Sequence, residues 1–123
     1  MNTWFLAAAA GSALICGLHI NFGRIETSKA LLEAPDLKTV PKFTAYYCWH
    51  LVSITLAGMA LAFWIAAGDQ GARPLAVFAT FGSGSFAIWS LSMIAIFKLR
   101  VWHFPQWALF LPVAVLGLLG LYL

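Results

Sequence analysis

Apolar residues form four long, nearly continuous runs along the chain, and polar residues gather in the short segments between them. The runs cover residues 3–22, 45–67, 74–97 and 105–123, and none alternates regularly between apolar and polar positions. A helix of roughly 20 apolar residues crosses the hydrocarbon core of a bilayer, whereas strands of membrane barrels alternate. The pattern therefore predicts an all-α integral membrane protein, a single domain folded as an up-down bundle of four transmembrane helices.

The longest polar segment separates the first two runs and contains a short helical pattern of its own. Glu26, Lys29 and Glu33 have helical spacing within residues 24–34, and Pro35 stops the pattern. We predict a short interfacial helix here, on the cytoplasmic side. It either lies flat along the membrane surface or covers that end of the bundle.

Composition and charge agree with a membrane protein and predict its orientation. Of the 123 residues, 63% are hydrophobic and 9% are charged, whereas about 25% are charged in a soluble domain. Because spans alternate in direction, six of the seven lysines and arginines fall on one side: Arg24, Lys29, Lys38, Lys42, Lys98 and Arg100. The positive-inside rule makes that side cytoplasmic and places both termini outside. The sequence contains no basic groove with interleaved aromatic residues, so nucleic acid is not an expected partner.

Small residues within the runs predict where helices approach one another. Gly58 and Ala62 are four residues apart, and the last run contains Gly117 and Gly120. Such spacing lets helix backbones approach closely, either within one bundle or between copies of the chain. We expect Gly58→Leu to harm folding for this reason. Trp89 falls near the middle of its span, unlike the other tryptophans, and is predicted to pack inside the bundle.

Two histidines lead the polar faces of the first two predicted helices. His19 and His50 fall near the cytoplasmic ends of consecutive spans, at similar depth. At 100° per residue, Cys16 shares the face of His19, while Tyr46 and Ser53 share the face of His50. Polar side chains inside a membrane face other helices, so we expect the two faces to meet. The predicted ligand-binding residues are the members of these faces and one nearby cation: His19, His50, Cys16, Tyr46, Ser53 and Arg24.

The same residues allow a redox interpretation. Two histidines on adjacent helices can ligate one haem iron axially, and His19, Cys16 and His50 form a candidate copper site. Cys48 and His50 are two residues apart, about 200° around a helix, so a four-ligand zinc site is not expected. The sequence contains no Ser/His/Asp arrangement, paired carboxylates or nucleotide loop. It therefore favours a non-catalytic protein over an enzyme.

Three segments resemble small four-span proteins of the bacterial inner membrane. They are GLHINFG at residues 17–23, YYCWHLVSI at residues 46–54 and FPQWALFLP at residues 104–112. The YgdD-like family is similar in layout and has a histidine in each of the first two places. The resemblance implies a four-helix fold in a bacterial cytoplasmic membrane, which makes both termini periplasmic. It implies no activity.

We therefore predict a non-catalytic membrane protein that binds a small ligand or partner in a cytoplasmic-side polar cavity around His19 and His50. One alternative is a haem- or metal-binding redox protein that uses the same histidines. A second alternative is an accessory structural subunit of a larger membrane complex, which the short loops and the nearly uncharged outer face favour. Beyond the lipid bilayer, the expected partners are further copies of the chain or that larger complex.

Overall fold

The computed structural model describes all 123 residues, and every regular element in it is helical. Four long helices coincide with the four apolar runs: α1 (Thr3–Gly23), α3 (Thr39–Gly68), α4 (Arg73–Phe97) and α5 (Gln106–Tyr122). The all-helical prediction is confirmed. Three of the helical segments are long and apolar enough to cross a membrane, and α5 is a shorter apolar helix of 17 residues.

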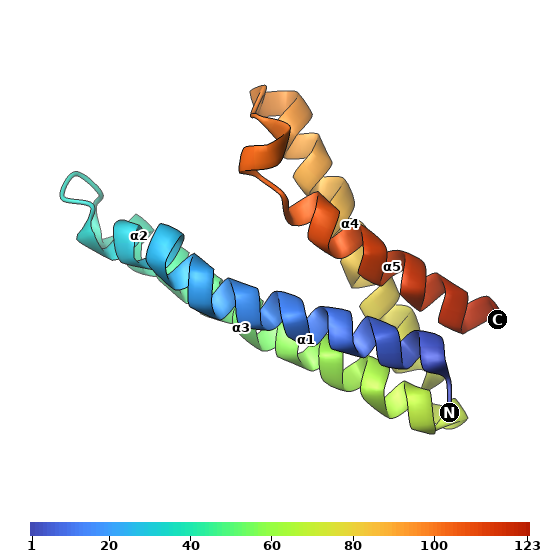
Figure 1. Cartoon of the computed structure of the whole chain (residues 1–123). Coiled ribbons are helices and arrows are strands. Elements are labelled where there is room, and N and C mark those ends of the chain that lie inside the picture. Colours follow the sequence, from blue (N-terminus) through green and yellow to red (C-terminus); the bar gives the residue numbers. More distant parts are fainter.

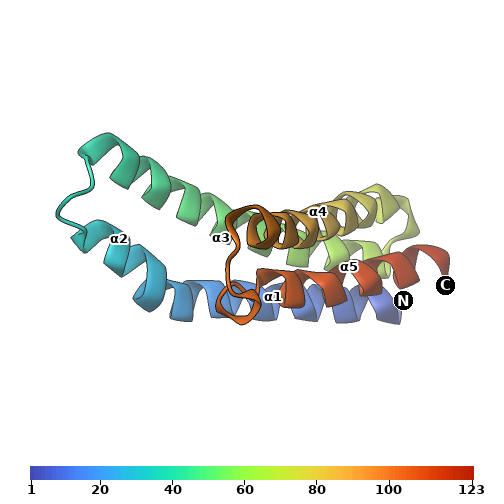
Figure 2. The same ribbon diagram turned by 90° about the horizontal axis from the view of Figure 1, so that it is seen from above.

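The segment after α1 is helical, but it is not a separate interfacial helix. The π-helical turn η1 (Arg24–Ser28) and α2 (Lys29–Glu33) continue α1 without a break and run beside the start of α3 (Figures 1 and 2). The backbone stays right-handed helical through this junction because neither a proline nor a left-handed residue interrupts it. The helix ends at Glu33, and Ala34 is extended, as expected for a residue that precedes proline.

The second long helix begins earlier than its apolar run. α3 starts at Thr39 instead of residue 45, so its first turns mix polar residues such as Lys42 with apolar ones such as Phe43. Pro41 lies in the first turn, where a missing backbone N–H breaks no intrahelical hydrogen bond. With 30 residues, α3 is about 45 Å long at about 1.5 Å per residue. It therefore exceeds the thickness of a bilayer core, which is about 30 Å.

The helices form two antiparallel hairpins, α1 with α3 and α4 with α5, which meet at one end and separate toward the other (Figures 1 and 2). We call the end with both chain termini the closed end. The end with the two hairpin tips, residues 34–38 and 98–105, is the open end. The α1 and α3 core residues, within 5–15 and 56–67, all belong to the closed half of the α1–α3 hairpin. Small side chains dominate the core contribution of α4, which consists of Ala76, Ala79, Thr80, Ser83, Ala87 and Ser90.

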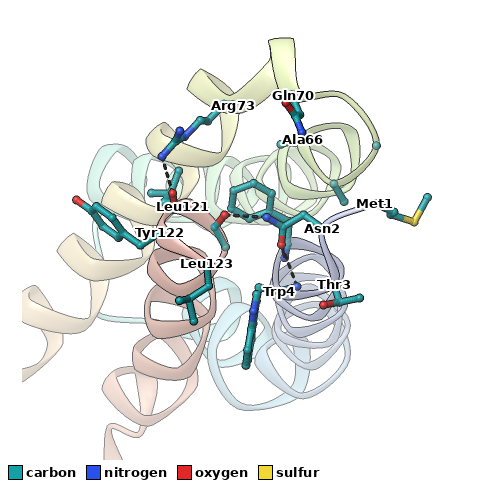
Figure 3. A pocket seen from close by; sticks show the side chains of 14 residues that line it. Met1, Asn2, Thr3, Trp4, Ala66, Gln70, Arg73, Leu121, Tyr122 and Leu123 are labelled. Carbon is teal, nitrogen blue, oxygen red and sulfur yellow. Dashed lines mark hydrogen bonds between the residues drawn. The ribbon is translucent and has the colours of Figure 1, made fainter.

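Asn2 joins three helix ends at the closed end (Figure 3). Its Oδ1 accepts hydrogen bonds from the backbone N–H groups of Trp4 and Phe5, at 3.1 and 3.2 Å, and so caps α1. Its Nδ2 donates to the Gly120 carbonyl at 2.7 Å, and its backbone N–H donates to the Ala67 carbonyl at 2.8 Å. A single residue therefore connects the start of α1 to the ends of α3 and α5.

The start of α4 is tied to the same end by Arg73. Its guanidinium donates a hydrogen bond to the Leu121 carbonyl near the end of α5 (Figure 3). A cavity of about 700 Å³ opens between these helix ends, and Asn2, Gln70 and Arg73 are among its polar lining residues. All four long helices are thus connected by polar contacts at the closed end.

Two glycines of α5 allow close contacts with neighbouring helices. A Cβ atom at Gly117 would collide with the Thr80 side chain, and one at Gly120 would collide with the Phe5 ring. The predicted close approach at Gly58 within one bundle is wrong, because that residue is exposed and a Cβ there meets nothing of the same chain within 4 Å. The spacing of small residues marks a helix face but does not reveal whether that face is covered.

Candidate functional site

The polar face of α1 is bound to the backbone of α3 by two hydrogen bonds. The Cys16 thiol donates to the Ser53 carbonyl at 3.7 Å. The His19 ring donates from Nε2 to the Trp49 carbonyl at 3.1 Å. Donors and acceptors are each about one helical turn apart, so the two bonds lie one above the other along the interface. The two predicted polar faces, led by His19 and by His50, therefore do meet at Cys16, His19 and Ser53.

The hydrogen bond to Trp49 determines the tautomer of His19. A carbonyl oxygen can only accept, so Nε2 carries the proton, and Nδ1 of the neutral ring is an acceptor. Gly23 lies beside this nitrogen: a Cβ there would be 3.8 Å from His19 Nδ1 and 3.4 Å from the Trp49 indole nitrogen. Because residue 23 has no side chain, space remains next to both ring nitrogens.

Four aromatic and imidazole rings form a continuous cluster around Trp49. The His19 ring stacks on the Trp49 indole, with centroids 4.7 Å apart and an interplanar angle of 27°. The His50 ring meets the same indole edge to face, at 5.0 Å and 84°. Tyr46 meets His50 in the same manner, at 4.6 Å and 86°. We call these four residues the His–Trp cluster. Because both imidazole rings contact Trp49, their centroids can be no further apart than the sum of their distances to the indole centroid, which are 4.7 Å and 5.0 Å.

The residue at the centre of this cluster was not among the predicted site residues. Trp49 contacts both histidines. Its spacing contained the signal, because Tyr46, Trp49 and Ser53 follow one another at intervals of three and four residues and so share one helix face. In the structure, the Ser53 hydroxyl donates to the Trp49 carbonyl at 3.4 Å, the same oxygen that His19 uses.

The two remaining predicted residues differ in their environment. His50 is exposed, and its ring nitrogens make no hydrogen bond within the chain, although Trp49 and Tyr46 orient the ring. Arg24 is also exposed, and its carbonyl accepts a hydrogen bond from the Ser28 hydroxyl at 3.1 Å. Its guanidinium contacts no member of the His–Trp cluster through a hydrogen bond.

The two main cavities lie away from the His–Trp cluster. The cavity described above is at the closed end, and a second cavity of about 290 Å³ lies at the open end. The second cavity is lined mainly by apolar residues of α3, α4, α5 and the α4–α5 loop: Val52, Phe86, Trp89, Ser90, Met93, Leu99, Phe104, Gln106 and Phe110. Neither cavity is lined by His19 or His50.

The sequence predicted that Trp89 packs inside the bundle, but the structure shows otherwise. Its exposed fraction is 60%, and its indole forms part of the wall of the open-end cavity. The prediction fails because the two hairpins separate at this level, so the middle of α4 has no fourth helix to cover it. Next to it, the buried Ser90 hydroxyl accepts a hydrogen bond from the Trp107 backbone N–H at 3.2 Å, which caps the start of α5.

The ligand set for a metal is limited. No group of three or more His, Cys, Asp or Glu side chains converges anywhere in the chain. Both cysteines are free thiols, with Cys16 half-buried between helices and Cys48 exposed. A ligand that bridged the two imidazoles of the His–Trp cluster would have to compete with the indole that contacts both of them.

Comparison of the chain with known protein families, curated proteins and solved structures gave no match. The features of the chain that bear on function are the apolar surface, the His–Trp cluster and the two cavities.

Proposed function

We propose that the chain is a non-catalytic, multi-pass protein of the bacterial inner membrane. Its exposed apolar surface supports this placement. Large apolar side chains are exposed on every long helix, including Leu14 at 65%, Ile54 at 69%, Phe78 at 73% and Val115 at 46%. If these side chains faced water, each would lose the favourable free energy of burial, which is about 25 cal/mol per Å² of apolar surface. In contact with lipid they incur no such loss.

The six-to-one distribution of basic residues supports an orientation with both termini periplasmic. Reporter fusions at Leu123 and within the 34–38 loop test this orientation. We expect the first fusion to give a periplasmic signal and the second a cytoplasmic one. A cytoplasmic signal from the Leu123 fusion would reverse the assignment. Recovery of the chain in the soluble fraction would end the membrane proposal altogether.

We further propose that the His–Trp cluster binds a small polar ligand or a partner at the cytoplasmic edge of the membrane. The observation that carries this proposal is the environment of the His50 ring. Its ring is exposed, has no hydrogen-bond partner in the chain, and is oriented by edge contacts with Tyr46 and Trp49. A polar group that is already oriented loses little conformational freedom when it binds. The open Nδ1 of His19 beside Gly23 adds an acceptor to the same cluster.

A photoreactive phenylalanine in place of Tyr47, which is exposed about one helical turn before His50, tests this binding in cells and leaves His50 intact. The matched control carries the same group in place of Ile54, which is exposed on the same helix. We expect one adduct of defined mass from position 47 that is absent at position 54, where only lipid adducts form. The same adducts at both positions would contradict the binding site.

The redox alternative uses the same two histidines and is separated by spectroscopy. A protein purified in mild detergent with a strong haem absorbance band, or with stoichiometric copper by elemental analysis, would replace the non-catalytic proposal. A change in that spectrum in His19→Ala and His50→Ala, but not in His103→Ala, would identify the ligands. A colourless, metal-free protein that still gives the adduct at position 47 would support the non-catalytic proposal.

A further inference from the structure

We propose that the open-end cavity is a binding site for an anionic phospholipid, with one acyl chain in the cavity and the phosphate at Lys98 and Arg100. The inference rests on the proposed membrane location and concerns a different part of the molecule from the His–Trp cluster. The apolar walls, the charges at the rim and the backbone of the adjoining loop each support it.

The walls of the cavity match an acyl chain. Seven of its nine lining residues are hydrophobic. Ser90, one of the two polar lining residues, already uses its hydroxyl to cap α5. The cavity volume of about 290 Å³ equals on the order of ten water molecules at about 30 Å³ each. Because these walls offer water few polar partners, filling the cavity with hydrocarbon is favourable.

Two cations flank one lining residue of the cavity, and we call them its charged rim. Leu99 lines the cavity and lies between Lys98 and Arg100 in the chain, and both cations are exposed although neither is itself a lining residue. They belong to the predicted cytoplasmic side, where anionic headgroups attract basic residues. Gln106, at the start of α5, adds an exposed amide to the lining. A neutral headgroup would leave the two cations without a partner, so the site favours a negatively charged phospholipid.

The backbone at Lys98 brings the charged rim next to the apolar walls. Lys98 has φ 51° and is the one residue other than glycine with a positive φ in the chain. This conformation is disfavoured for a residue with a Cβ atom. It ends α4 abruptly, with the Leu99 N–H donating to the Ile94 carbonyl at 3.0 Å, and Leu99 lies in the cavity wall. Backbone strain of this kind is concentrated at binding sites.

Native mass spectrometry of the full chain in detergent tests the site with two lipids of identical acyl chains, phosphatidylglycerol and phosphatidylcholine. We expect one retained phosphatidylglycerol per chain and markedly less phosphatidylcholine. Val52→Phe places a larger side chain at the cavity wall and should displace the lipid. Ile54→Phe, two residues along the same helix and outside the cavity, should retain it.

A charge variant keeps the test independent of the cavity shape. Lys98→Asn combined with Arg100→Gln removes both cations, and asparagine tolerates the left-handed conformation. We expect phosphatidylglycerol binding to weaken about thirtyfold. The control, Lys29→Gln with Lys38→Gln, removes two exposed cations from the other hairpin and should change little.

Three results would overturn the lipid site: equal retention of the two lipids by the wild-type chain, equal phosphatidylglycerol binding by Val52→Phe and Ile54→Phe, or equal binding by the two charge variants. Each would leave the membrane location standing if the chain remains in the membrane fraction. A chain found in the soluble fraction would instead refute the proposed membrane location itself.

Discussion

The closed and open ends of the molecule are built from different side chains. At the closed end, glycines at positions 117 and 120 leave room for the Thr80 side chain and the Phe5 ring, and Asn2 and Arg73 tie the helix ends together. At the open end, the hairpins stand apart, and large rings occupy the helix faces. The His–Trp cluster lies on one hairpin, and Trp89 lies on the other.

This difference shows how one short chain can combine a firm core with open sites. Small side chains give many close contacts between helices. Large aromatic side chains offer broad apolar faces to a ligand. We therefore expect substitutions at the closed end to act mainly on stability, and substitutions at the open end to act mainly on binding.

The largest expected effect is that of Gly117→Leu at the closed end. The new side chain would overlap Thr80 and force α4 and α5 apart, which costs about 3 kcal/mol in the free energy of unfolding. Unfolding in mixed micelles, followed by circular dichroism, measures this loss. The matched controls are Gly58→Leu and Gly84→Leu, where a Cβ meets nothing within 4 Å. Similar losses in all three variants would show that the closed end has no special role in packing.

Asn2→Ala should have the next largest effect. It removes the α1 cap and the hydrogen bond to Gly120, which lowers the free energy of unfolding by about 1–2 kcal/mol. The same micelle titration measures it. Asn21→Ala, on the open side of α1, removes only a hydrogen bond to the Gly17 carbonyl of its own helix. It should change stability by less than about 0.5 kcal/mol. Equal destabilisation of the two alanine variants would contradict the expected difference in stability effects between the closed and open ends.

His19→Phe should produce a smaller loss. Phenylalanine keeps a ring against Trp49 but cannot donate to its carbonyl. A hydrogen bond between membrane helices contributes roughly 0.6 kcal/mol, so the unfolding free energy should fall by about that amount. His103→Phe, in the exposed turn before α5, is the control. A loss as large as that of Gly117→Leu would mean that the open end is as tightly packed as the closed end.

The two thiols should differ in reactivity without any change in stability. Cys48 is exposed, whereas Cys16 is half-buried and donates to the Ser53 carbonyl. In detergent, a maleimide should therefore react faster with the Cys16→Ser protein, which keeps Cys48, than with the Cys48→Ser protein. Mass spectrometry over time measures both rates. Equal rates would indicate that α1 and α3 separate at the level of Cys16 more readily than the contact suggests.

The histidine site shows how far pattern analysis reaches. Helical spacing alone predicted that the polar faces of α1 and α3 meet, and the Cys16–Ser53 and His19–Trp49 hydrogen bonds agree with this. It did not identify the indole that joins the two histidines. The expected cavity around the histidines rested on the two polar faces alone, and neither cavity described above is lined by His19 or His50.

The sequence by itself determined the helices, because long apolar runs satisfy their backbone hydrogen bonds internally and polar segments interrupt them. It also determined which helix faces are polar, since that depends only on 3.6 residues per turn. The tertiary structure alone decided which small residues are in contact and which rings are exposed. Gly58 and Gly117 are both glycines within apolar helices, yet only Gly117 has a helix against it. That difference depends on which face each helix turns toward its neighbours, which is set by contacts between residues distant in the chain.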